Sequence, residues 1–253
     1  MTGDFQGYRS YEPGDDPREV DWRATARARQ AMVRQRSCEG RRPVAIVVDV
    51  SASMWLETKQ GLDAIRPIDM AFETAVWLSA AATLRQSPLD VILASDRVEL
   101  HLARMQGRHA IRHIVSAATA FRPQHAATAW ADAVTEANRF RPGSYVFWIS
   151  DFTWLPDPVA FRRAFGHVQS LGVRVVSEQS GFESSGGLVR DAETGEVVDA
   201  SRCMQGRSLS ERVNRWSVES AVPVLDVDVR IERPELLLAD WLRGSSAASG
   251  WSK

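Results

Sequence analysis

Residues 44–53 read VAIVVDVSAS, and this stretch decides the fold class. Its first half is an uninterrupted apolar run rich in β-branched residues, which is typical of a strand buried on both faces of a parallel sheet. Asp49, Ser51 and Ser53 follow at the point where such a strand ends. Open α/β sheets bind ligands where the carboxyl ends of their strands meet the following loops. The stretch therefore predicts both a buried central strand and an oxygen-rich functional loop.

Helical and strand patterns alternate through the rest of the chain. We expect helices over residues 68–85, 108–118, 130–139, 158–170, 207–217 and 234–242, and strands over 89–94, 98–103, 145–149, 173–178 and 223–229. This alternation predicts an α/β fold with a doubly wound, mostly parallel sheet. Residues 187–200, with Glu193-Thr-Gly-Glu196 at their centre, predict a β-hairpin inserted near an edge of the sheet.

Composition divides the chain into three parts. Residues 1–42 contain nine Arg and seven acidic residues without an extended apolar run, which predicts an N-terminal polar arm. Within the arm, the Pro-Gly and Asp-Pro pairs of residues 11–17 are turn signals, and a short helix is expected over 22–29. Residues 43–243 are expected to form the α/β domain, and residues 244–253 a flexible tail.

Charge and length exclude several classes of protein. The net charge of the 253 residues is −1, which gives no global attraction to nucleic acid or to anionic lipid. Cys38 and Cys203 form neither a disulfide framework nor a paired metal motif. No apolar run is long enough for a membrane span, and the first residues lack the apolar core of a signal peptide. We therefore expect a cytoplasmic protein whose recognition is local.

Oxygen donors gather at the predicted carboxyl edge of the sheet. The strand VFWIS is followed by Asp151, and Thr128 precedes a predicted helix. Hard divalent cations such as Mg²⁺, and also Mn²⁺ or Ca²⁺, prefer such oxygen ligands. Asp49, Ser51, Ser53, Thr128 and Asp151 are therefore the predicted metal ligands. The alternative is structural, because Asp and Ser are also favoured as helix caps.

The order of these loops carries a family resemblance. Asp-x-Ser-x-Ser after one strand, a later Thr and a strand-terminal Asp resemble the metal-ion-dependent adhesion site (MIDAS) of von Willebrand factor A domains. The arm motif GYRSYEPGDDPREVDW (residues 7–22), Ile149-Ser-Asp-Phe152 and residues 191–196 resemble the bacterial domain-of-unknown-function family fifty-eight. The resemblance covers nearly the whole chain and implies a von Willebrand A-like, Rossmann-like fold.

Members of this family are typically encoded beside MoxR-type AAA+ ATPases. The resemblance therefore implies an adaptor role, with a MoxR-type ATPase or its client as partner, in chaperone-like maturation or remodelling of other proteins. It implies no catalysis. Many relatives carry transmembrane helices before the arm, and we do not carry membrane anchoring over to this chain.

Two groups of residues are predicted to bind a partner. Trp55 and Trp154 each follow a proposed metal loop closely enough to lie on its rim, where exposed aromatic side chains anchor partners. The second group, Arg18, Asp21, Trp22 and Arg23, lies in the arm. For the arm, ion pairs within the chain and a docking surface are both open alternatives.

Other functions lack parts that their chemistry requires. A phosphatase-like, Mg²⁺-dependent hydrolase could use Asp49 as its nucleophile, but that chemistry normally needs a second acid two residues later, where Ser51 stands. The chain also has no nucleophile elbow, phosphate loop or dinucleotide fingerprint. We therefore expect no enzyme. A metal-independent scaffold that binds through the arm or the 187–200 hairpin is a further alternative.

Overall fold

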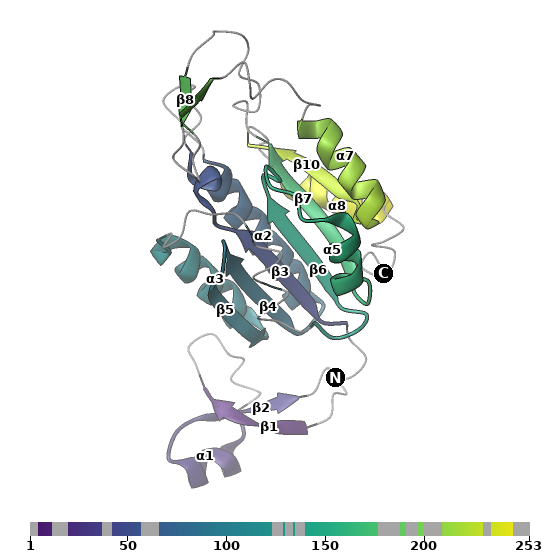
Figure 1. Ribbon diagram of the computed structural model, residues 1–253. Helices are drawn as coiled ribbons and strands as arrows, with labels where there is room; N and C mark the ends of the chain where they lie inside the picture. Colours follow the sequence, from purple (N-terminus) through teal and green to yellow (C-terminus); the bar gives the residue numbers. More distant parts are fainter. Residues whose placement is uncertain are drawn as a thin grey trace.

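The computed structural model describes residues 5–11, 20–36, 42–56, 66–122, 129, 134, 140–176, 188–190, 197–199, 209–229 and 234–244. A sheet of six strands forms the centre of the molecule (Figure 1). Its strands are β3 (Val44–Asp49), β4 (Leu89–Ala94), β5 (Val98–Met105), β6 (Tyr145–Ser150), β7 (Gln169–Val176) and β10 (Val224–Asp228). They lie in the order β10-β7-β6-β3-β4-β5.

Every pairing in this sheet is parallel except that of β4 with the edge strand β5. The predicted strand of residues 44–49 is central, and all six of its residues are buried. Strands β6 and β4 flank it on either side, so the end of β3 lies beside the end of β6. The α/β fold with a doubly wound, mostly parallel sheet is thus confirmed.

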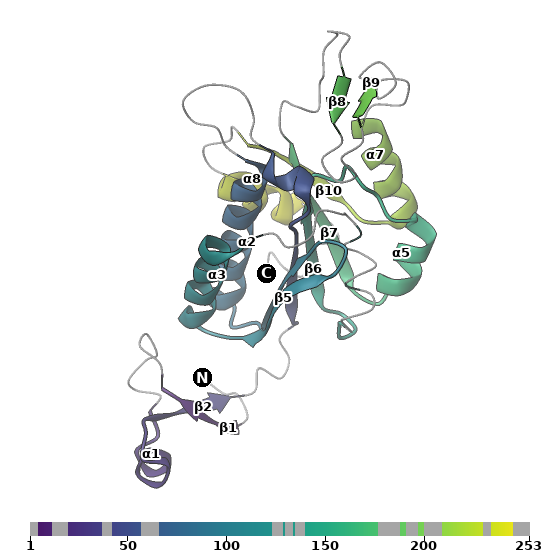
Figure 2. The ribbon, with the colours of Figure 1, turned by 60° about the vertical axis from the view of Figure 1, so that its left-hand side comes forward.

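Helices cover both faces of the sheet. The helices α2 (Pro67–Leu84), α3 (Arg108–Ala120) and α8 (Pro234–Gly244) lie on one face, and α5 (Pro158–Phe165) and α7 (Leu209–Ser220) on the other (Figure 2). The side chains of each strand alternate between the two layers. Ile46 and Val48 of β3 belong to the first apolar cluster, whereas Ala45 and Val47 belong to the second. Such alternation is expected for a strand buried on both faces.

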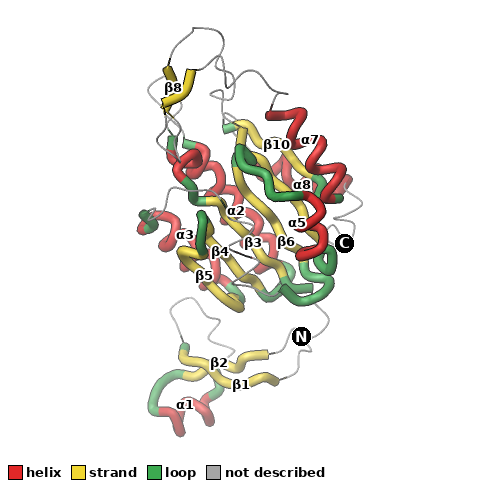
Figure 3. The backbone as a smooth tube through the Cα atoms, viewed as in Figure 1, coloured by secondary structure: helices red, strands yellow, loops and turns green. Residues whose placement is uncertain are grey.

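The arm contains more structure than its polar composition indicates. Strands β1 (Phe5–Ser10) and β2 (Met32–Arg36) pair antiparallel, and α1 (Trp22–Ala28) lies between them in the sequence. Neither strand was predicted, because charged and polar residues interrupt the apolar alternation on which such predictions depend. The arm lies at the end of the large sheet where β3 and β6 begin, opposite the end that carries Asp49 (Figures 1 and 3).

One helical prediction differs from the structure. The predicted helix 158–170 is wrong in its last part: α5 ends at Phe165, and residues 169 and 170 belong to β7. The reason is sheet pairing, since Leu171 lies opposite Phe147 and is fully buried there. The predicted helix 130–139 lies outside the described residues apart from Val134, which is helical, and the predicted tail 244–253 lies outside them apart from Gly244, the last residue of α8.

The predicted hairpin is present in the described segments, where β8 (Leu188–Arg190) pairs antiparallel with β9 (Val197–Asp199). Among the described ranges, none of the helices combines the length and the apolar character that crossing a lipid bilayer requires.

Candidate metal site at the carboxyl edge of the sheet

The first loop of the site begins with the buried carboxylate of Asp49. This residue ends β3 and is 1 % exposed. Its Oδ1 accepts a hydrogen bond from the backbone N–H of Ser51 at 2.9 Å. Ser51 is the N-cap of the short 3₁₀ helix η2 (Ala52–Trp55), and its hydroxyl lies 3.3 Å from that of Ser53. The loop thus brings one carboxylate and two hydroxyls to the end of a central strand.

The second loop follows β6. Asp151 is half-buried, and its Oδ1 accepts hydrogen bonds from the backbone N–H of Thr153 at 3.0 Å and from the Thr153 hydroxyl at 2.9 Å. In the described part of the chain, its Oδ2 has no hydrogen-bond partner. One oxygen of Asp151 is therefore fixed by the loop while the other remains available.

The two loops meet through Ser150, which sequence reasoning did not single out. The Ser150 hydroxyl donates to Asp49 Oδ2 at 2.6 Å and accepts from the backbone N–H of Phe152 at 3.0 Å. Its contact with Asp49 spans 101 positions of the sequence. In the sequence, a Ser before Asp151 is only a weak indication of a functional residue. Its role becomes visible once β6 is seen to pair with β3, because this pairing brings Ser150 to Asp49.

The electrostatics of the site are unfavourable for the isolated protein. Burial raises the pKa of Asp49 from an ordinary value of 3.8 to about 7, and the negative charge of Asp151 adds to this rise. Hydrogen bonds from Ser150 and Ser51 act in the opposite direction but do not compensate. A buried carboxylate beside a second carboxylate is costly unless positive charge accompanies it.

Asp49, Ser51 and Ser53 lie at the end of β3 and Asp151 at the end of the neighbouring strand β6, and their role as metal ligands stays a prediction. This oxygen donor set fits a hard divalent cation, whose charge would offset the repulsion between the two carboxylates. No cluster of three or more His, Cys, Asp or Glu side chains suited to a metal occurs in the described ranges, so any site here depends on hydroxyls and water.

Thr128, the fifth predicted ligand, lies outside the described residues. The next residue, Ala129, donates its backbone N–H to the carbonyl of Ser95 at 3.4 Å. Ser95 directly follows β4, whose last residue, Ala94, pairs with Asp49. The chain immediately after Thr128 is thus attached to the same edge of the sheet.

The predicted rim tryptophans differ in how they are held. The Trp55 Nε1–H donates to the carbonyl of Val50 at 3.1 Å, and its ring stacks on Phe121 with centroids 6.2 Å apart. The guanidinium of Arg66 lies 5.1 Å from the Trp55 ring centroid. Trp154 is half-buried and packs against the second apolar cluster. Trp55 is therefore a rigid, partly exposed side chain next to the first loop.

The predicted partner residues of the arm lie at the other end of the molecule (Figure 1). Asp21 is buried and caps α1, since its Oδ1 accepts from the backbone N–H groups of Arg23 and Ala24 at 3.0 Å. Trp22 is 72 % exposed, and Arg23 is also exposed. Arg18 lies outside the described residues. Asp21 thus has a structural role, whereas Trp22 and Arg23 present their side chains to solvent.

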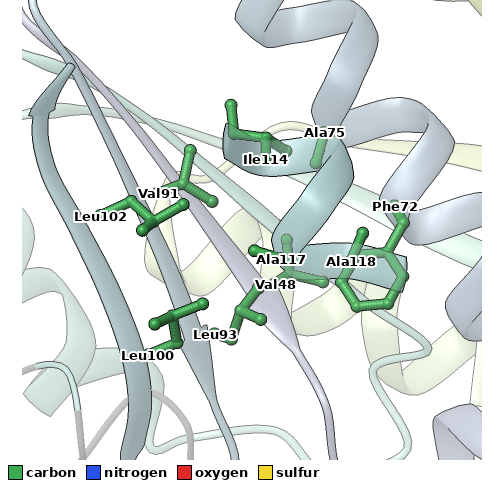
Figure 4. Close-up of a pocket in the computed structure, with 10 residues that line it drawn as sticks. All are labelled: Val48, Phe72, Ala75, Val91, Leu93, Leu100, Leu102, Ile114, Ala117 and Ala118. Atoms are coloured by element: carbon green, nitrogen blue, oxygen red, sulfur yellow. The ribbon is translucent and has the colours of Figure 1, made fainter. Parts of the chain in front are cut away.

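A small cavity lies away from these loops, between β3, β4, β5, α2 and α3 (Figure 4). Its lining side chains, among them Val48, Phe72 and Ile114, are all apolar. They offer no polar group to orient a substrate, so the cavity belongs to the packing of the core.

Comparison with known proteins agrees with this fold. The family model described as "Protein of unknown function DUF58" matches residues 7–215. No curated protein matches the chain. The crystal structure of the conserved hypothetical protein BatB from Bacteroides thetaiotaomicron is similar, with a TM-score of 0.54 and 14 % identity, over 83 % of this chain and 98 % of that one.

Two further solved structures are less similar. An aerotolerance-related membrane protein from Bacteroides fragilis has a TM-score of 0.49 and 14 % identity, over 83 % of this chain and 94 % of its own. The VWA domain of SpRpn10 has a TM-score of 0.45 and 9 % identity, over 83 % and 97 %. The similarity to BatB shows the fold alone.

Proposed function

The chain belongs to the DUF58 family of proteins of unknown function, and we propose that it is a protein-interaction adaptor that holds a divalent cation between β3 and β6. Asp49, Ser51, Ser53 and Asp151 would bind Mg²⁺, or Mn²⁺ or Ca²⁺, directly or through water, with Thr128 as a fifth ligand. The observation that carries this proposal is that the Asp49 carboxylate is buried beside Asp151. Burial, and after it the negative charge of Asp151, raises the pKa of Asp49 to about 7.

Each loop would have a separate task. Hydrogen bonds from Ser51 and Ser150 hold the two oxygens of Asp49 in place. One oxygen of Asp151 accepts two hydrogen bonds from Thr153, and no described residue donates to the other oxygen, which leaves it for a cation or its water. When bound, the cation would supply an open coordination position for an acidic side chain of the partner.

The proposed partner is another protein. The family resemblance favours a MoxR-type AAA+ ATPase or its client, with an Asp or Glu that reaches the metal loops. Trp55 supports this proposal because it is held rigidly beside the first loop, and a rigid aromatic side chain loses little conformational freedom on binding.

We propose that the site performs no catalysis. The residue two positions after Asp49 is Ser51, whose hydroxyl contacts Ser53, and general acid–base chemistry would need a carboxyl there. Turnover of an aryl phosphate that requires Mg²⁺ and is lost in Asp49→Asn would establish the hydrolase instead.

A metal-independent scaffold is the second candidate function. It is favoured by the exposed Trp22 and Arg23 on α1, which lie at the opposite end of the sheet from Asp49. The adaptor and the scaffold would thus bind through different surfaces, which can be tested separately by mutation.

Affinity capture from the source cell's lysate tests the adaptor. Wild type, Asp49→Ala and Asp157→Ala are compared in Mg²⁺ and in EDTA. Asp157 is a matched control, because it is exposed and only caps α5 through the Ala160 N–H. We expect an AAA+ ATPase or its client to be held by wild type and Asp157→Ala in Mg²⁺ alone. Equal capture under all conditions, with loss in Trp22→Ala, would favour the scaffold.

A further inference from the structure

The hydroxyl of Ser150 joins the two carboxylate loops through one atom. Ser150 is buried at the end of β6, where it donates to Asp49 Oδ2 at 2.6 Å and accepts from the Phe152 N–H at 3.0 Å. A serine hydroxyl has a single proton, which it donates to Asp49, and its oxygen lone pair accepts the hydrogen bond from the Phe152 N–H. The end of β3 is thereby tied to the backbone just after Asp151.

On the Asp49 side, the carboxylate is held from two directions. Ser150 occupies Oδ2, and the Ser51 N–H occupies Oδ1 at 2.9 Å. Because Ser150 donates to one oxygen and Ser51 to the carboxylate from its own loop, the plane of the carboxylate is set by β6 as well as by that loop. Removal of the Ser150 hydroxyl would leave only the local contacts from Ser51.

On the Asp151 side, the backbone is held in an unusual conformation. Phe152 has φ +56°, a left-handed value that a non-glycine residue rarely adopts. Its N–H bonds Ser150, and its buried ring packs against Trp216 with centroids 5.7 Å apart. Trp216 in turn donates to the carbonyl of Pro156 at 2.9 Å. These contacts fix the loop, and Ser150 is its link to Asp49.

We propose that Ser150 is a positioning residue whose hydroxyl sets the separation of the Asp49 and Asp151 carboxylates and thereby the cation that the site prefers. This inference rests on the proposed function, since it requires a cation there. Mg²⁺ demands near-octahedral geometry with short ligand distances, whereas Ca²⁺ accepts more ligands in a more flexible arrangement. A loosened pair of loops should therefore lose more affinity for Mg²⁺ than for Ca²⁺.

Isothermal titration calorimetry of the full chain with Mg²⁺ and with Ca²⁺ tests the inference. The variant is Ser150→Ala, and the matched control is Ser144→Ala. Ser144 is also buried and precedes the same strand at its other end, and its hydroxyl has no hydrogen-bond partner among the described residues. We expect Ser150→Ala to weaken Mg²⁺ binding about tenfold or more. Ca²⁺ binding should fall less, and Ser144→Ala should bind both cations as wild type does.

Thermal unfolding in EDTA shows whether each variant is folded. If Ser150→Ala does not fold, Ser150→Cys takes its place, because a thiol has nearly the same shape and is a weak donor. A folded variant that keeps the wild-type ratio of Mg²⁺ to Ca²⁺ affinity would overturn the inference and leave the proposed function intact. Absence of cation binding by wild type would overturn both.

Discussion

Asp49 ends β3 and Asp151 directly follows the neighbouring parallel strand β6, so two carboxylates, one buried and one half-buried, lie at one edge of the sheet. Burial and the negative charge of Asp151 raise the pKa of Asp49 to about 7. The fold creates this arrangement by placing β6 directly beside β3. A cation bound at a protein-interaction site would offset the repulsion between the two carboxylates.

The stability of the metal-free protein should depend on the titration of Asp49. Its pKa in the folded state, about 7, lies above the ordinary value of 3.8. Its stabilising contribution is therefore complete below pH 3.8 and is lost as the pH rises through 7, with a slope of at most about 1.4 kcal/mol per pH unit.

Urea unfolding in EDTA between pH 4 and 8 measures this loss. In Asp49→Asn the corresponding part of the slope should disappear, and saturating Mg²⁺ should stabilise wild type more at pH 8 than at pH 5. An identical pH dependence in wild type and Asp49→Asn would contradict the assignment.

Gly172→Ala should disturb the site from a distance. A Cβ at Gly172 would meet Val224 Cγ2 at 2.9 Å and Phe152 Cζ at 3.2 Å, in a part of the core that is already filled. We expect the variant to lose about 1–3 kcal/mol of unfolding free energy and to bind Mg²⁺ more weakly, because Phe152 must shift. Ser170→Ala on the same strand is the control. If Gly172→Ala is as stable as this control, the neighbouring side chains accommodate the added Cβ at no cost in stability.

Asp21→Ala should destabilise the arm. The carboxylate caps α1 through two backbone N–H groups, and the loss of such a cap costs about 1 kcal/mol. Hydrogen exchange of residues 22–28 should therefore be faster in Asp21→Ala than in the control Arg23→Ala, whose side chain is exposed. If hydrogen exchange is unchanged in Asp21→Ala and the variant no longer binds a partner, Asp21 is a docking residue and not a structural one.

Trp55→Ala should weaken partner binding more than Trp77→Ala does. Both indoles are partly exposed, but Trp55 follows the first metal loop and Trp77 lies on α2. The truncation of a central aromatic anchor costs about 2 kcal/mol or more, which is roughly a thirtyfold loss of affinity. Surface plasmon resonance with the captured partner measures the difference, and equal losses in the two variants would exclude the rim from the interface.

The sequence was sufficient to predict the central sheet because its strands carry their own signal. Residues 44–49 are apolar and buried throughout, and the Asp and Ser residues after them are local to one loop. The strands of the arm were missed, since their stability comes from pairing and from contacts such as that of the Tyr8 hydroxyl with Asp21 at 3.3 Å. Residues 169 and 170 were assigned to a helix for a similar reason, because their pairing with β6 is not visible in the local sequence.

The candidate site likewise contains residues that the local sequence indicates and residues that only tertiary contacts reveal. Asp49 and Asp151 could be placed from strand ends alone. Ser150 could not, because its role depends on a hydrogen bond to a residue 101 positions away. Trp216 likewise reaches the second loop through Phe152 and Pro156, from a helix that follows much later in the chain. Tertiary contacts of this kind require the strand order to be known.

A crystal grown with Mn²⁺ tests the central claim most directly, because anomalous scattering locates this cation without reference to the protein. We predict a single strong peak among the oxygens of Asp49, Ser51, Ser53 and Asp151, which is absent in crystals of Asp49→Asn grown in the same way. A well-ordered first loop with no peak beside it at saturating Mn²⁺, or a peak only elsewhere on the molecule, would contradict the account.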